Sequence, residues 1–322
     1  MIQRISDDDI YRAVTAVPEL DSWPEARALF APKEGVSRLD WQLPAVACQA
    51  VTGDSSLALP AVAAIACLQI SIILVDDMLD DDPRGEFRRL GVGRTANLAL
   101  AFQSAGSGLL RQVQTGSAER LAASEALAQA ALATAFGQEL DVQNLKGEES
   151  YWRVVEAKST PFYGAALQVG ALLAGAGQAV SGGLYRYGVL LGEIIQVWDD
   201  LIDAFQVPAG PDWLEGRNNL ALLYASHADH PERELFQHLM GRAADAAALA
   251  DAQAILVRSG AVSYCVYQLA HRAGAARRQL APLQLHDPAP LAEILDAQVA
   301  PIASWLGNMG LKVPDELRAG RA

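Results

Sequence analysis

The stretch Asp76-Asp77-Met78-Leu79-Asp80-Asp81-Asp82 places five acidic side chains within seven residues, directly after the apolar run 58–75. Successive residues of a helix turn by about 100°, so Asp76 and Asp80 share one face with Asp77 beside them. Carboxylates this close repel one another, and a hard divalent cation such as Mg²⁺ relieves the repulsion. Standing alone, such a cluster is more often a solvated surface.

A second acidic motif supports a metal-binding role for the first one. The stretch Asp199-Asp200-Leu201-Ile202-Asp203 repeats the pattern D-D-x-x-D and again closes an apolar run, residues 187–198. Two helices that each end in this motif predict carboxylates facing each other across one cavity. Because Mg²⁺ is usually held by one or two carboxylates together with substrate phosphates, the pair predicts several Mg²⁺ ions around a diphosphate.

Composition is that of a globular protein with a sizeable core. The 322 residues are 51% hydrophobic and 20% charged, and we expect one domain over residues 1–322. A net charge of −13 argues against nucleic acid as a partner. The three cysteines lie in apolar contexts without metal-ligand spacing, which predicts buried free thiols. The polar, acidic start of the chain predicts no signal peptide, so we expect a cytoplasmic protein.

The apolar run 58–75 is nearly long enough to cross a membrane. It is rich in alanine, contains Pro60, Gln69 and Ser71, and leads straight into the acidic cluster. These features favour a buried core helix, and no transmembrane segment is expected.

An all-α fold is predicted, because helix-forming residues dominate almost every long segment and strand-like alternation is rare. Residues 18–37 are expected to be an irregular connection, since they contain three prolines and a glycine. Residues 164–177 are rich in small side chains, which suits close helix packing. Outside the two acidic helices, the predicted helices cover residues 6–17, 39–51, 96–113, 118–145, 148–157, 220–226, 232–250, 254–280 and a last segment ending near 306.

Basic residues near the motifs leave two questions open. Lys158 stands among small and apolar residues just before Pro161, where a helix should break or kink. Either it reaches solvent along the surface or it has an anionic partner. The arginines after the first motif either bind phosphate or balance nearby acid. These arginines are Arg84, Arg88, Arg89 and Arg94.

The two motifs suit one reaction class. Metal ions at a diphosphate neutralise the charge that develops on the leaving group when the carbon–oxygen bond of an allylic diphosphate ionises. A dry apolar pocket protects the allylic cation from water. A double bond, from a second substrate or from the same one, then attacks the cation.

From these motifs, the chain resembles the trans-isoprenyl diphosphate synthase (polyprenyl synthetase) family over roughly residues 35–226. The resemblance implies an isoprenoid synthase-type helical bundle around a deep central cavity, usually as a homodimer. It is carried by the first motif, Gly137-Gln138 with Asp141, Tyr151 before Lys158-Ser159, Gln196 with the second motif, and the stretch 212–224.

The resemblance also implies roles for individual residues. Mg²⁺ is the implied cofactor, with Asp76, Asp77, Asp80, Asp199, Asp200 and Asp203 as its ligands. The implied catalytic residues are Asp76, Asp77, Asp80, Lys158, Asp199 and Asp200. Lys158, Ser159 and Gln196 would hold the allylic diphosphate and its cation. The resemblance implies that Gln69 and Arg84 are the parts of the isopentenyl diphosphate site that this sequence retains.

Several positions depart from the family pattern. The family's G-K-x-x-R-P stretch falls on residues 36–41, so Ser37 replaces a lysine and Asp40 an arginine. An aspartate there would repel a diphosphate. The family's Arg-Arg-Gly falls on Pro83-Arg84-Gly85, and an alignment on Arg88-Arg89 is the alternative. A Gly-Lys pair usual after the second motif is absent.

Three functions therefore remain open. The first is a Mg²⁺-dependent prenyltransferase that condenses an allylic diphosphate with isopentenyl diphosphate. The second is a terpene synthase-like enzyme that uses one allylic diphosphate. The third is a non-catalytic partner subunit of a synthase, although two intact acidic motifs argue against it. The residues four and five positions before Asp76, Ile72 and Ser71, are not the aromatic pair typical of short-chain enzymes, and the chain length of the product stays open.

Overall fold

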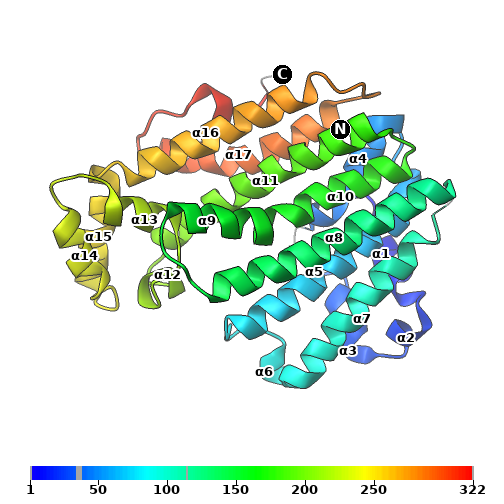
Figure 1. The fold of residues 1–322 in the computed structure, drawn as a ribbon, viewed down its shortest axis with the longest axis horizontal. Helices are drawn as coiled ribbons and strands as arrows, with labels where there is room; N and C mark the ends of the chain where they lie inside the picture. The colour runs from blue at the N-terminus through cyan, green and yellow to red at the C-terminus, as the bar shows by residue number, and fades with distance from the viewer. Residues whose placement is uncertain (1, 34–37, 114, 321–322) are drawn as a thin grey trace.

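Helix α5 (Leu59–Leu79) runs through the middle of the bundle and ends in the first acidic motif. The computed structural model describes residues 2–33, 38–113 and 115–320, and within these ranges it is helical with no strand (Figure 1). The predicted all-α fold is confirmed. Residues 61–68 of α5 are all buried, which explains why this segment is apolar on every side.

Burial identifies α5 as a core helix. By length and composition, Ser56–Leu79 is the one described helix that could cross a membrane, but 61% of its most apolar window is buried inside the protein. It packs against α7 (Val92–Leu110) and α1 (Asp7–Thr15). The approach to α7 is close, since a Cβ on Gly106 would lie 3.0 Å from the backbone oxygen of Ala64.

The second motif ends α11 (Gln178–Ala204), which packs along α10 (Thr160–Leu173). In turn, α10 contacts α4 (Leu43–Thr52) and α8 (Ser117–Val142). A Cβ on Gly170 would lie 2.2 Å from the backbone oxygen of Pro44, and one on Gly188 would lie 2.4 Å from that of Tyr163. The small residues predicted to allow close packing do so here.

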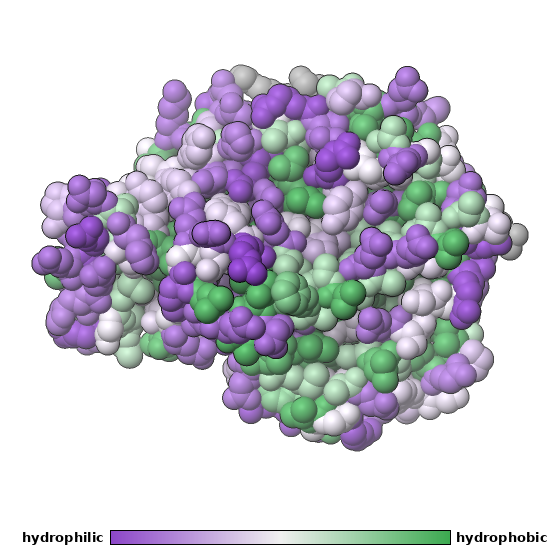
Figure 2. Space-filling model, in the orientation of Figure 1, coloured by the Kyte–Doolittle hydropathy of each residue, from purple (hydrophilic) through white to green (hydrophobic). Residues whose placement is uncertain are grey.

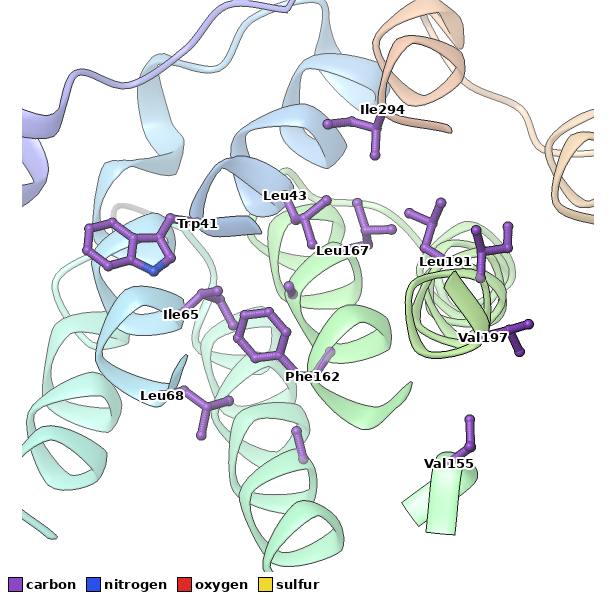
Figure 3. Packing of buried hydrophobic residues seen from close by; sticks show 14 of the residues in the cluster. Trp41, Leu43, Ile65, Leu68, Val155, Phe162, Leu167, Leu191, Val197 and Ile294 are labelled. Atoms are coloured by element: carbon purple, nitrogen blue, oxygen red, sulfur yellow. The ribbon is translucent and has the colours of Figure 1, made fainter. Parts of the chain in front are cut away.

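Large apolar side chains fill the space among these helices. Figure 3 shows Leu43 of α4, Leu167 of α10 and Leu191 of α11 gathered at one level of the core, with Phe162 below them. All four are at most 5% exposed. The core therefore fixes α10 and α11 relative to each other, and the ends of these helices carry the acidic side chains and Lys158 to the same place.

The expectation for residues 18–37 was wrong where the structure describes them. Short helices α2 (Pro18–Asp21) and α3 (Pro24–Phe30) occupy this region, each with its proline in the first turn. Proline is tolerated there because the first backbone N–H groups of a helix have no intrahelical partner. Phe30 anchors α3 by packing edge-on against Phe102. Residues 34–37, with Ser37 among them, lie outside the described ranges.

The boundaries after residue 232 were also wrong. Instead of two long helices there are three, α14 (Arg233–Met240), α15 (Ala246–Arg258) and α16 (Ala261–Leu280). Asp245 caps the start of α15, and Gly260, at φ +88°, separates α15 from α16. Continuous alanine- and leucine-rich sequence hid both breaks.

The remaining elements complete the bundle. They are η1 (Leu39–Gln42), η2 (Ser56–Ala58), α6 (Phe87–Leu90), α9 (Glu148–Val154), η3 (Val155–Ser159), α12 (Pro211–Leu214), α13 (Leu220–His227), α17 (Ala289–Asn308) and η4 (Asp315–Leu317). The prediction of buried free thiols is confirmed, since Cys48, Cys67 and Cys265 are all buried and unpaired.

Candidate active site

Both acidic motifs line one cavity of about 390 Å³ between α5, α10 and α11. Seven aspartates face it, against two basic side chains, Lys158 and Arg217. Its apolar wall includes Ile72, Val155 and Phe162. The aspartates are Asp76, Asp80, Asp141, Asp199, Asp200, Asp203 and Asp212. The predicted arrangement of two motifs across one cavity is confirmed.

Lys158 has an anionic partner, which answers the first open question. Its Nζ lies 2.7 Å from Oδ1 of Asp76 and 2.6 Å from Oδ2 of Asp141. Burial alone would lower the pKa of Lys158, but the charges and hydrogen bonds of the two aspartates outweigh it and shift the pKa upward. The lysine therefore remains charged and links α5 to α8.

An irregular turn positions this lysine. It belongs to η3, a wide π-helical turn between α9 and α10, next to the expected break at Pro161. Helix α8 packs closely against the backbone of this turn, since a Cβ on Gly137 would lie 2.2 Å from the backbone nitrogen of Lys158. Gly137 is therefore needed to let the turn fit.

Arg217 is the second cation of the site, and the sequence reasoning did not assign it a role. Its Nη1 lies 2.8 Å from Oδ2 of Asp80, and its Nη2 lies 2.9 Å from Oε2 of Glu215. Burial, together with the charge of Asp76, raises the pKa of Asp80, while the nearby cations oppose this shift. The family-like stretch 212–224 was the available signal, since it contains Arg217 and Asp212.

Within the second motif, Asp199 and Asp203 face the cavity. In the described part of the chain, neither forms an ion pair with a basic side chain. Burial raises the pKa of Asp199 to about 6, with further contributions from the charges of Asp203 and Asp40. Burial also raises the pKa of Asp203, and the charge of Arg84 partly offsets this shift.

Asp200 has a different environment. It is 3% exposed, its Oδ2 accepts from the backbone N–H of Leu220 at 2.8 Å, and its Oδ1 accepts from Gln196 at 3.0 Å. Burial raises its pKa to about 7. Asn219 donates to the backbone oxygen of Asp200 at 2.7 Å and to Asp212 at 2.8 Å. These bonds join α11 to α13, and Asp200 as a metal ligand stays a prediction.

Ser159 and Gln196 lie side by side in the cavity, where the serine hydroxyl donates to Oε1 of Gln196 at 2.7 Å, and their role in substrate binding stays a prediction. Gln69 also lines the cavity and donates from Nε2 to Oδ2 of Asp40 at 3.1 Å. Of the two residues before the first motif, Ile72 faces the cavity, whereas Ser71 is buried and donates to the backbone oxygen of Leu68.

Two predicted residues lie outside the cavity lining. Asp77 stands beside the motif, and burial and the charges of Asp82 and Asp76 raise its pKa to about 6. Arg84 pairs with Asp82 at 2.8 Å and its side chain is 88% exposed. The structure therefore places Arg84 at the rim.

The other arginines of the basic patch each pair with a nearby acid, and phosphate binding by them stays an open prediction. Arg88 pairs with Asp81 and Arg89 with Glu86, while Arg94 pairs with Glu25 of α3. Among the residues described, no three histidine, cysteine or carboxylate side chains are already assembled as a metal-binding group.

Comparison with known proteins agrees with this geometry. The family model described as polyprenyl synthetase matches residues 42–256. Octaprenyl diphosphate synthase of Escherichia coli is 30% identical over 218 residues, which cover 62% of this chain and 65% of that protein. A short chain isoprenyl diphosphate synthase of Methanothermobacter thermautotrophicus is 30% identical over 67% of this chain and 71% of its own length. The chain thus spans about two thirds of these curated relatives.

Solved structures share the fold. A geranylgeranyl pyrophosphate synthetase from Geoglobus acetivorans superposes with a TM-score of 0.77 at 22% identity, covering 92% of this chain and 99% of that one. The geranylgeranyl pyrophosphate synthetase from Pyrococcus horikoshii superposes with a TM-score of 0.76 at 19% identity. The match covers 88% of this chain and 91% of that one. The bundle is therefore that of known isoprenoid synthases.

Asn219 provides a test of how the second motif is anchored. Its amide is fully buried, bonds Asp200 and Asp212, and accepts from the backbone N–H groups of Ala221 and Leu222 at the start of α13. We expect Asn219→Ala to lower the free energy of unfolding by about 2–4 kcal/mol, measured by urea denaturation.

The control for this measurement is Asp245→Ala, which removes a helix cap accepting from Ala248 without any bond to the site. It should cost only about 1 kcal/mol. Equal losses for the two variants would show that Asn219 is an ordinary cap and does not anchor the second motif.

Proposed function

This chain belongs to the polyprenyl synthetase family, and on that premise we propose that it ionises an allylic isoprenyl diphosphate and transfers the prenyl group, releasing diphosphate. Isopentenyl diphosphate is the acceptor that the family resemblance implies. One observation carries the proposal: the two D-D-x-x-D motifs line the same cavity, with Lys158 between carboxylates of α5 and α8.

We propose Mg²⁺ as the cofactor. The donor set fits a hard cation, because seven carboxyl groups line the cavity and, within the described part of the chain, only two basic side chains line it with them. Asp199 and Asp203, without basic partners among the described residues, and Asp76 and Asp80 would hold the metal. When bound, Mg²⁺ would neutralise the negative charge of the diphosphate.

The protein's own residues would do the rest. Lys158 and Arg217 would donate to the diphosphate oxygens once their present carboxylate partners bind metal. The apolar wall formed by Ile72, Val155 and Phe162 would exclude water from the prenyl chain. Gln196, fixed by Ser159 and Asp200, would present its amide to the reacting carbon.

A substitution in the first motif tests the assignment. Asp76→Ala should reduce diphosphate release with Mg²⁺ at least about 100-fold, because it removes a proposed ligand and the partner of Lys158. Circular dichroism should show unchanged helicity. As a control, Asp229→Ala at an exposed position should leave turnover as it was. Turnover of the Asp76 variant within a few-fold of the parent would refute the role of the motif.

Lys158 gives a second test. Lys158→Ala should raise KM for the allylic diphosphate or lower kcat by roughly 10- to 100-fold, the range expected for losing hydrogen bonds to a charged group. Lys158→Arg, which keeps the charge, should recover part of the loss. Steady-state kinetics at saturating Mg²⁺ would measure both. If alanine left both constants unchanged, Lys158 would have only its structural bonds to Asp76 and Asp141.

A terpene synthase-like reaction, in which a double bond of the same prenyl chain is the nucleophile, is the second candidate. The specific observation in its favour is the acidic Asp40, which accepts a hydrogen bond from the cavity-lining Gln69. Both candidates share the ionisation of the allylic diphosphate. The pairing of both motifs around one cavity argues against a purely non-catalytic subunit, which has no use for seven facing aspartates.

We also propose a homodimer formed through α7 and α8. Large apolar side chains are exposed on these helices, with Leu100 at 62%, Leu132 at 73% and Phe136 at 54%. In Figure 2, hydrophobic residues form a band on the face over α5, α7 and α8. Contiguous apolar surface of this kind marks interaction sites, and a second copy is the partner that the family resemblance implies. The three buried thiols support a cytoplasmic location.

The double variant Leu132→Asp/Phe136→Asp tests the dimer. Charges at the centre of an apolar interface should convert a dimer to a monomer in analytical ultracentrifugation, because the buried carboxylates would be unpaired. The control is Leu235→Asp/Val257→Asp, also at exposed apolar positions but on α14 and α15. A monomeric parent, or a double variant that remains dimeric, would contradict this interface.

A further inference from the structure

Two side chains of the cavity lining carry buried polar atoms without a hydrogen-bond partner of normal geometry in the described part of the chain. They are the hydroxyl oxygen of Tyr151 and Oδ1 of Asn218. The amide of Asn218 still donates from Nδ2 to the backbone oxygen of Leu145 at 2.6 Å, whereas the hydroxyl is the only polar group of the Tyr151 side chain. Leaving a buried hydroxyl unpaired costs free energy, so buried polar groups are almost always bonded. Packing of the fold alone does not account for the hydroxyl of Tyr151.

Aromatic and charged contacts fix the ring of Tyr151. The residue is 2% exposed, and its ring packs edge-on against Trp152 with 4.9 Å between the ring centroids. The guanidinium carbon of Arg272 on α16 lies 4.0 Å from the centroid of the Trp152 ring, and its Nε lies 2.6 Å from Oε2 of Glu193 on α11. The position of the Tyr151 hydroxyl is therefore braced from two neighbouring helices.

Tyr151 belongs to the same wall of the cavity as Lys158. The two residues lie on one continuous segment, since α9 leads through η3 into α10 (Figure 1). Residues three, four and seven positions apart share a face of a helix, and Tyr151, Val154, Val155 and Lys158 all line the cavity. The hydroxyl is thus carried by the segment that also presents a cation to the site.

Asp200 is the acceptor that suits this hydroxyl. Burial and the charge of Asp200 raise the pKa of Tyr151 well above its usual value, so the hydroxyl stays protonated at neutral pH. The carboxylate of Asp200 can take a further donor, because its two oxygens offer about four acceptor sites and the bonds from Leu220 and Gln196 use two of them.

We infer that Tyr151 is a positioning residue of the site, and that its hydroxyl donates to the Asp200 carboxylate when Mg²⁺ and diphosphate bind in the cavity. The inference rests on the proposed function, since the bound ligand is what moves the carboxylate. A carboxylate that turns toward a cation redirects its lone pairs, and the fixed hydroxyl beside it then meets an oxygen at hydrogen-bond geometry. The new bond would hold Asp200, and through it Gln196, in one orientation.

Tyr151→Phe tests this inference, because it removes the hydroxyl and keeps the ring. Without Mg²⁺ and diphosphate, the variant should unfold at the urea midpoint of the parent, since the structure gives the hydroxyl no bond to lose. In calorimetric titration of inorganic diphosphate into the full chain with Mg²⁺, the Kd of the variant should be about tenfold weaker, which corresponds to 1.4 kcal/mol.

The matched control is Tyr187→Phe on α11. The hydroxyl of Tyr187 is also buried, but it donates to the backbone oxygen of Leu291 at 2.7 Å, and the residue lies away from the cavity lining. This control should show the opposite pattern, with a lower urea midpoint and the diphosphate Kd of the parent.

Steady-state kinetics distinguishes a role in holding the bound ligand from a role in the chemical step. A bond formed on loading is present in the ground state and in the transition state alike. Tyr151→Phe should therefore raise KM for geranyl diphosphate about tenfold and change kcat less than about twofold. A lower kcat with an unchanged KM would overturn the inference.

A Tyr151→Phe variant that binds diphosphate as tightly as the parent would overturn the inference and leave the proposed function standing. So would a urea midpoint that falls as far as that of Tyr187→Phe, because the hydroxyl would then already be bonded within the fold. A parent that binds no diphosphate with Mg²⁺ would contradict the proposed function and the inference together.

Discussion

Repulsion among carboxylates is the constraint around which this structure is arranged. Seven aspartates line one cavity, five of them from the two motifs, and among the described residues only two basic side chains line it with them. Lys158 joins Asp76 to Asp141, and Arg217 joins Asp80 to Glu215. Burial makes each uncompensated charge more costly, and this is visible in the raised pKa values of Asp77 and Asp199, both about 6. This surplus of carboxylates is the basis for the proposal that the site binds cations.

The packing of small residues makes the arrangement possible. Gly137 lets α8 approach the backbone at Lys158, and Gly170 and Gly188 let α10 lie against α4 and α11. The wide turn η3 then directs Lys158 inward. Because these contacts are between backbones, a single added methyl group at any of the three positions would displace a helix that carries a site residue.

The sequence predicted the large features because they depend on local pattern. Two apolar runs ending in D-D-x-x-D predicted the facing helices, and Pro161 predicted the break that holds Lys158. It did not predict partners set by tertiary contacts. The Lys158 bridge to Asp141, the pairing of Arg217 with Asp80 and the outward position of Arg84 depend on how distant segments meet. The short helices at Pro18 and Pro24 are not evident from the sequence, because a proline in the first turn of a helix and a proline in an irregular connection give the same local pattern.

The second motif contains two adjacent aspartates whose different environments cannot be predicted from the motif alone. Asp199 and Asp200 are adjacent in sequence and both line the cavity, yet only Asp200 is bonded to Gln196 and to the start of α13. These bonds tie Asp200 to the segment that follows Arg217. Only the fold distinguishes them.

The most direct test of the central claim, that the two motifs together hold a diphosphate through a divalent cation, is calorimetric titration of inorganic diphosphate into the full chain with and without Mg²⁺. The account predicts binding that requires Mg²⁺ and is lost when Asp80 and Asp199 are each replaced by alanine. Binding that is equally tight with a chelator present, or that survives both substitutions, would contradict it.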